Sequence, residues 1–224
     1  YFHPALEDKP IIFVQVALTN GLGKSIQEIT KPRSDGDQKY DSATFYSISN
    51  CQEGLSRVTL GNFLIKRVVF EIQEELPNIK HFGTLSPIPG FRDWFSYLED
   101  VKIKNILGDV PIESISFLKS SDLKVGDPRI VANKVAITKL VAHYLMNEKN
   151  HKQLPINDVC RFHLGNGAII DDIVINANIS EVGLNRSFGV MVNYLYELKN
   201  IEKNHEEYIN NKTIIISDKL KKII

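Results

Sequence analysis

The chain has 224 residues, enough for one large domain with a substantial core or for two small domains. Its apolar fraction of 43% and charged fraction of 24% are those of an ordinary soluble globular protein. Lys and Arg number 27 and so do Asp and Glu, which argues against a nucleic-acid-binding protein, because such proteins carry a basic excess. A small anionic ligand needs only a local positive site.

Two cysteines, Cys51 and Cys160, lie far apart at no metal-ligand spacing, which favours reduced, packed thiols and an intracellular, cytoplasmic protein. We find no apolar run long enough to span a bilayer and no signal peptide, so we expect no membrane partner. Because the first residue is Tyr1 rather than Met, we expect an upstream segment, and organellar targeting stays open.

Two stretches near the start of the chain are typical of strands. Residues 11–17 are apolar and end at the turn-forming Thr19-Asn20-Gly21, and residues 43–48 are rich in strand formers. The polar residues 30–42 between them predict a surface loop.

The next stretch predicts an amphipathic helix that ends at Pro77, with apolar residues at helical spacing at Ile65, Val68, Val69, Ile72 and Leu76. A short strand at 79–85 and helical pieces at 91–98, 112–123 and 130–146 follow, then strands at 169–175 and 213–216. This order predicts a single α+β (mixed α/β) domain over residues 1–224, with a helical insertion near residues 91–155.

The strand–loop–helix unit at residues 45–76 is a candidate diphosphate site. Free N–H groups at a helix N-terminus favour an anion, Gly54 and Gly61 permit close approach of the backbone, and Lys66 adds charge. The spacing matches neither a P-loop nor GxGxxG, so the residues alone favour glycines that serve turn geometry.

Three further segments carry candidate chemistry. Pro87 holds Ser86 on extended backbone, although Ser-Pro also occurs in surface turns. His163, between two bulky apolar residues and before a turn, is expected half-buried with a pKa near neutrality, or simply structural. Asn193 and Tyr196 are predicted on one face of a helix, where an aromatic core stripe is the alternative. No histidine stands at metal spacing, so we expect no metal.

Together, in this order, the motifs resemble the malonyl-CoA decarboxylase family. The resemblance runs from residue 2 to about residue 210 and rests on HPAL at 3–6, IFVQVAL at 12–18, FYSISNCQ at 45–52, LGNFLIK at 60–66, LSPIPGF at 85–91, FHLGNGA at 162–168, GVMVNYLY at 189–196 and NHEEY at 204–208.

The resemblance implies a GCN5-related N-acetyltransferase-like central sheet flanked by helices, with coenzyme A diphosphate held at the strand–loop–helix unit. It places the catalytic residues at Ser86, His163 and Tyr196. The residues that it implies for binding of malonyl-CoA or coenzyme A are Ser49, Gln52, Gly54, Leu55, Gly61, Lys66, Asn166, Gly167 and Asn193.

The implied reaction is decarboxylation of malonyl-CoA to acetyl-CoA and CO2 through an enolate. Because the thioester carbonyl accepts the electrons, no separate cofactor is expected, and coenzyme A is part of the substrate. Ser86 is expected to position the carboxylate or relay a proton, and His163 with Tyr196 to supply acid and hydrogen-bond donors. Backbone N–H groups near Asn166 and Gly167 are expected to face the enolate oxygen.

Two departures from the family pattern matter. Family members carry a helical N-terminal domain and the beginning of the catalytic domain before the HPAL segment, whereas this sequence begins at Tyr1. Residues 174–178 read Val-Ile-Asn-Ala-Asn where the family has Asn-Trp-Leu-Ala-Asp, which removes side chains expected to support the histidine. The alternatives to an active decarboxylase are a truncated piece that needs another polypeptide, a non-catalytic acyl-CoA-binding remnant, and an acyltransferase. A homo-oligomer and pairing with a helical N-terminal domain both stay open.

Overall fold

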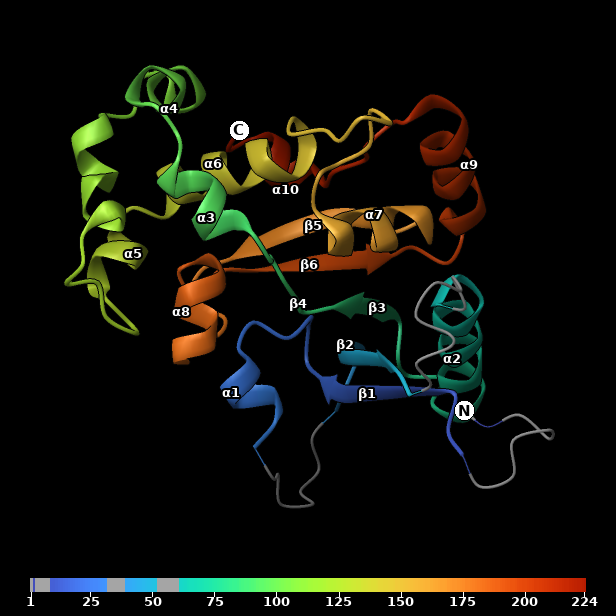
Figure 1. The fold of residues 1–224 in the computed structure, drawn as a ribbon. Coiled ribbons are helices and arrows are strands. Elements are labelled where there is room, and N and C mark those ends of the chain that lie inside the picture. The colour runs from blue at the N-terminus through green and yellow to red at the C-terminus, as the bar shows by residue number, and fades with distance from the viewer. Residues whose placement is uncertain (1, 3–8, 32–38, 52–60) are drawn as a thin grey trace.

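A computed structural model describes residues 2, 9–31, 39–51 and 61–224 (Figure 1). The strands are β1 (Ile12–Thr19), β2 (Ser42–Asn50), β3 (His81–Thr84), β4 (Ser86–Pro87), β5 (Ile169–Val174) and β6 (Met191–Tyr196). They form one mixed sheet of order β1-β2-β3-β6-β4, with β5 also paired to β6.

Only β2 and β3 are parallel in this sheet; every other pair of named strands is antiparallel. The four strands expected at 11–17, 43–48, 79–85 and 169–175 are confirmed. The strand expected at 213–216 is wrong as a strand, because Ile216 makes one isolated bridge to Ile170.

The helices are α1 (Ile26–Ile29), α2 (Gly61–Glu75), α3 (Phe91–Ser96), α4 (Asp100–Leu107), the 3₁₀ helix η2 (Ile112–Lys119), α5 (Pro128–Ala132), α6 (Lys134–Met146), α7 (Asp158–Gly165), α8 (Glu181–Ser187), α9 (Ile201–Asn211) and α10 (Asp218–Lys221). The amphipathic helix before Pro77 is confirmed as α2. The helix expected at 130–146 is divided into α5 and α6 at Asn133.

The two faces of the sheet carry different cores. Phe45 and Phe82 belong to the large core, which also includes buried residues of α2, α6 and α7. Leu85 and Met191 pack instead with Ile29 of α1 in a small second core. Because burial of one large apolar side chain contributes about 1.5–3 kcal/mol, the large core fixes α7 against the sheet. The mixed sheet with flanking helices confirms the predicted fold class.

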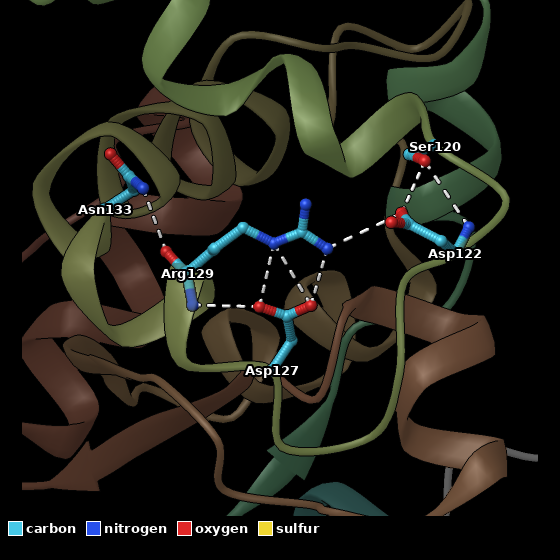
Figure 2. Close-up of polar contacts among 5 residues, drawn as sticks. All are labelled: Ser120, Asp122, Asp127, Arg129 and Asn133. Carbon is cyan, nitrogen blue, oxygen red and sulfur yellow. Dashed lines mark hydrogen bonds and ion pairs between the residues drawn. The ribbon is translucent and has the colours of Figure 1, made fainter.

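The turn before α5 is held by an ion-pair network in the helical insertion (Figure 2). The Asp127 carboxylate accepts the backbone N–H of Arg129 at 2.9 Å and its Nη2 at 2.7 Å. A second carboxylate, Asp122, lies 3.5 Å from the same Nη2. The hydrogen bond from Arg129 lowers the pKa of Asp127. This cluster closes the loop that precedes α5.

Candidate active site

The two parallel strands stop pairing just before Ser86. The last paired residues are Phe45 and Thr84, and the Leu85 N–H then donates to the Phe45 carbonyl at 2.9 Å. Ser86 pairs with Val192 of β6 instead. In open sheets, ligands bind outside the carboxyl ends of parallel strands, and Ser86 lies at this point.

The Ser86 side chain is almost fully buried, at 6% exposure. Its hydroxyl donates to Oγ1 of Thr84 at 2.8 Å, and its oxygen lies 3.0 Å from Nε2 of His163. Pro87 favours the extended backbone that lets Ser86 join β4, as expected from the sequence. The sheet and α7 therefore bring Ser86 and His163 together.

Asn157 positions the helix that carries His163. Its Oδ1 caps α7 by accepting the Cys160 N–H at 2.8 Å, and its Nδ2 donates to the Pro89 carbonyl at 2.9 Å. Tyr144 also donates its hydroxyl to the Pro89 carbonyl, at 3.0 Å. The start of α7 is thus tied to the segment that directly follows Ser86.

His163 is enclosed by aromatic side chains and is only 3% exposed. Its Nδ1 lies 2.8 Å from the Tyr196 hydroxyl, and its ring stacks on Tyr194 at 4.4 Å between centroids and 24° between planes. Burial lowers the pKa of His163 to about 3 and raises the pKa of Tyr196 well above 10. The expected half-buried histidine with a pKa near neutrality is wrong: the imidazole is buried and neutral.

The expected helix at Asn193 and Tyr196 is also wrong, because both lie on β6. Successive residues of a strand point to opposite faces, so Tyr194 and Tyr196 share the face of His163 while Asn193 points away. The Asn193 Nδ2 donates to the carbonyls of Gly23 at 3.0 Å and Thr84 at 2.8 Å. Asn193 therefore holds the end of β3, which carries Thr84, from the face of the sheet opposite His163.

The backbone donors expected at Asn166 and Gly167 are already used. The Asn166 N–H donates to the His163 carbonyl at 3.1 Å, and the Gly167 N–H donates to the Leu164 carbonyl at 2.9 Å. Gly167 has φ +80°, and a Cβ there would lie 2.1 Å from the Ile201 carbonyl oxygen. These groups end α7 rather than facing an enolate, and that expectation is wrong.

The candidate coenzyme residues are only partly described. Gln52, Gly54 and Leu55 lie outside the described residues, whereas Ser49 is exposed near the end of β2 and Gly61 begins α2. Lys66 of α2 pairs with Glu202 of α9, with 2.6 Å between Nζ and Oε1. The helix N-terminus therefore follows β2 in the expected strand–loop–helix order.

The altered segment 174–178 does not supply the contacts of His163 that the structure gives. Its ring nitrogens meet Ser86 and Tyr196. Asn178 instead accepts hydrogen bonds from Gln27 at 3.3 Å and Ser180 at 2.7 Å. The departure therefore leaves the direct partners of the histidine in place.

Sequence reasoning missed three residues of this site: Thr84, Asn157 and Tyr194. The first stands two residues before Ser86 on extended backbone, so period two places both hydroxyls on one face. Asn157 is an N-cap residue type before an apolar helical run.

Within the described residues, no group of three or more His, Cys, Asp or Glu side chains is placed to hold a metal. No helix there is long and apolar enough to cross a membrane.

Comparison with known proteins finds relatives that match the whole chain. The family model "Malonyl-CoA decarboxylase C-terminal domain" matches residues 1–224. Mitochondrial malonyl-CoA decarboxylase of Rattus norvegicus is 36% identical over 246 aligned positions, which cover 100% of this chain and 50% of the rat protein. The crystal structure of malonyl-CoA decarboxylase from Rhodopseudomonas palustris matches with a TM-score of 0.88 and 38% identity, over 99% of this chain and 51% of that one.

A more distant likeness bears on the fold alone. The loading GNATL domain of CurA from Lyngbya majuscula matches with a TM-score of 0.50 at 13% identity, over 88% of this chain. The chain spans about half the length of the malonyl-CoA decarboxylases that it matches. By its match over all 224 residues, the chain belongs to the malonyl-CoA decarboxylase family, in the part formed by the C-terminal domain.

Proposed function

We propose that this chain decarboxylates malonyl-CoA to acetyl-CoA and CO2. The observation that carries the proposal is the buried hydrogen-bonded series Ser86–His163–Tyr196 at the end of the parallel strands. The names of the relatives supply the substrate. The series supplies what the chemistry needs, a proton source in a site sheltered from water.

The reaction moves one electron pair and one proton. The bond between C2 and the carboxylate carbon breaks, CO2 leaves, and the pair flows into the thioester carbonyl to give an enolate. C2 of the enolate then takes a proton and becomes the methyl group of acetyl-CoA. We propose no separate cofactor, because the thioester itself accepts the electron pair.

Ser86 is the proton donor that this arrangement favours. Its hydroxyl is the member of the series nearest the point where β2 and β3 stop pairing. As Ser86 gives its proton to C2, Nε2 of His163 restores it, and the Tyr196 hydroxyl hydrogen-bonded to Nδ1 restores the imidazole. After the product leaves, one proton from solvent enters at Ser86 and the transfers through His163 run back to Tyr196, so the overall reaction consumes one proton.

A neutral imidazole suits this role. Because burial holds the pKa of His163 at about 3, the ring carries no positive charge that would stabilise the substrate carboxylate before CO2 leaves. It can still accept a proton at one nitrogen while it gives one from the other. Stacking on Tyr194 fixes the ring plane for both transfers.

Coenzyme A is proposed to lie along the strand–loop–helix unit. The N-terminus of α2 leaves N–H groups without helical partners, and these favour the diphosphate. We propose that the acyl group reaches Ser86 at the point where β2 and β3 stop pairing, after Phe45 and Thr84. The acyl-CoA would thus bring its thioester to Ser86 with the diphosphate near Gly61.

The test is acetyl-CoA formation from malonyl-CoA by the purified chain. We expect turnover, and we expect His163→Gln to lower kcat by about 100-fold or more. The exposed His151 offers a matched control, and His151→Gln should leave the rate unchanged. Equal rates of acetyl-CoA formation by His163→Gln and the unmodified chain would contradict the proposal. Acetyl transfer to an amine without release of CO2 would also contradict it.

A second candidate is a catalytic half that needs another polypeptide. Its support is that the chain spans about half of its relatives. It predicts coenzyme A binding without turnover, and turnover when the N-terminal half of a relative is added. Activity of the isolated chain at the rate of the mixture would exclude it.

The compartment and assembly of the chain are also proposals. The free thiols of Cys51 and Cys160 support an intracellular location. The rat relative is named as mitochondrial, so an organelle is a further candidate. Oligomeric state is best tested by sedimentation of the purified chain, alone and with the N-terminal half of a relative.

A further inference from the structure

Thr84 is a buried residue whose hydroxyl takes no part in the proton transfers of the proposed reaction. It is 1% exposed and ends β3, two residues before Ser86. Its Oγ1 accepts the Ser86 hydroxyl at 2.8 Å and faces the Tyr194 backbone N–H at 3.4 Å. Thr84 is thus a hydrogen-bond acceptor at the Ser86 end of the series.

The bond to Thr84 decides which atom carries the proton between Ser86 and His163. A serine hydroxyl has one hydrogen, and in this geometry Ser86 donates it to Thr84. The 3.0 Å contact with Nε2 can then be a hydrogen bond only if Nε2 carries a proton and donates it. This places the imidazole proton on Nε2.

The contact at the other end of the series is compatible with the same tautomer. The Tyr196 hydroxyl lies 2.8 Å from Nδ1, and no other acceptor for its proton is found among the described residues. Since a buried hydroxyl without an acceptor is costly, Tyr196 donates to an unprotonated Nδ1. In this arrangement the imidazole proton is again on Nε2.

We infer that Thr84 is a positioning residue that sets the direction of this hydrogen-bond series, Tyr196 to His163 to Ser86 to Thr84, and so holds His163 in the Nε2–H tautomer. This inference rests on the proposed function for its catalytic consequence. In that direction, the nitrogen beside Ser86 holds the proton that replaces the one given to C2. With the opposite direction, Ser86 would have to be recharged by an unprotonated nitrogen.

The matched variants are Thr84→Val, which keeps the shape and removes the acceptor, and Thr84→Ser, which restores a hydroxyl. Thr19→Val is the control, because Thr19 is equally buried and its hydroxyl pairs with Thr44 at 3.0 Å, away from His163. Each is measured in two ways: by the ¹⁵N chemical shifts of the His163 ring in histidine-labelled chain, and by kcat and KM.

We expect a protonated Nε2 and an unprotonated Nδ1 in the unmodified chain, in Thr84→Ser and in Thr19→Val. In Thr84→Val the only acceptor left among the described residues for the Ser86 hydroxyl is Nε2, and this bond competes with the bond from Tyr196 to Nδ1. Both ring signals should therefore shift toward a mixture of tautomers. Thr84→Val should lower kcat by about tenfold or more, less than loss of His163 itself, with KM within about twofold. A merely structural role for Thr84 would not move the ring signals.

Two results would overturn the inference. One is a protonated Nδ1 in the unmodified chain. The other is a folded Thr84→Val chain whose ring signals match those of Thr84→Ser. Because the ring signals need no turnover, the inference can fail while the decarboxylase proposal stands, and it can hold in a chain that proves inactive.

Discussion

Nδ1 of His163 and the hydroxyl oxygen of Tyr196 lie 2.8 Å apart, and both side chains are at most 3% exposed. Neither group can exchange its partner for water. The cost of breaking this contact is therefore the full cost of an unpaired buried polar group, about 1–3 kcal/mol.

Tyr196→Phe tests this contact. It leaves Nδ1 unpaired, so we expect a loss of about 1–3 kcal/mol in the free energy of unfolding and a fall in kcat of about 100-fold. Urea unfolding and malonyl-CoA turnover measure the two effects. Tyr97→Phe is the control, since Tyr97 is 88% exposed and should change neither. A Tyr196→Phe chain with unaltered kcat would remove Tyr196 from the mechanism.

The buried imidazole predicts a pH dependence of stability. The pKa of His163 is about 3 in the folded chain and about 6.5 when exposed, so below pH 6.5 the unfolded chain binds the extra proton. Stability is full above about pH 6.5 and is lost as the pH falls toward about 3. Between about pH 7 and about pH 5 the loss from this group is about 2 kcal/mol.

Urea unfolding at these two pH values checks that loss. His163→Gln removes the group that titrates, so its loss over the same interval should be smaller by about 2 kcal/mol. The difference between the two chains isolates His163 from the carboxylates, which both chains share. Identical losses would mean that the imidazole is not buried in solution.

The end of α7 depends on Gly167. Its φ is +80°, and a Cβ added there would lie 2.1 Å from the Ile201 carbonyl oxygen, so Gly167→Ala should cost more than about 2 kcal/mol. Gly165→Ala is the matched control, because its nearest contact would be 3.9 Å away and alanine favours a helix. Thermal unfolding should show a lowered Tm only for the first. Equal Tm values would contradict the close approach of α9.

Asn157 joins two roles that can be separated. Asn157→Ala removes both the cap on α7 and the bond to the Pro89 carbonyl, and should cost about 1–2 kcal/mol. Asn157→Ser keeps a capping oxygen but is too short to replace the bond to Pro89. We expect both variants to have a lowered kcat, because both lose the hydrogen bond between α7 and the Pro89 carbonyl, which follows Ser86. Asn157→Ser should nevertheless recover most of the stability, because it keeps the cap. Full recovery of kcat would show that the tie to Pro89 is dispensable.

How far the sequence predicts the fold depends on the range of the interactions. Residues 65–76 predict α2 because apolar spacing and Pro77 act locally. The helix expected around Asn193 is a strand, because a short apolar and aromatic run fits either structure and pairing with β3 and β5 decides.

The candidate site shows the same limit. From the residues alone, Ser86 could also belong to a surface turn and His163 could be a structural histidine. The family resemblance predicted both as catalytic residues, and the structure places Oγ of Ser86 3.0 Å from Nε2 of His163. Thr84 escaped notice because its role depends on the direction of one hydroxyl proton. The neutral state of His163 could not be predicted either, since burial by Tyr194 is a tertiary effect.

The most direct test of the central claim is a reaction of malonyl-CoA with the purified chain in D2O, followed by mass spectrometry of the product. The account predicts acetyl-CoA with one deuterium on C2 from each decarboxylation, and the loss of this product when Ser86→Ala removes the donor hydroxyl. Undiminished formation of the deuterated product by Ser86→Ala would contradict it, as would a chain that binds coenzyme A and forms no acetyl-CoA.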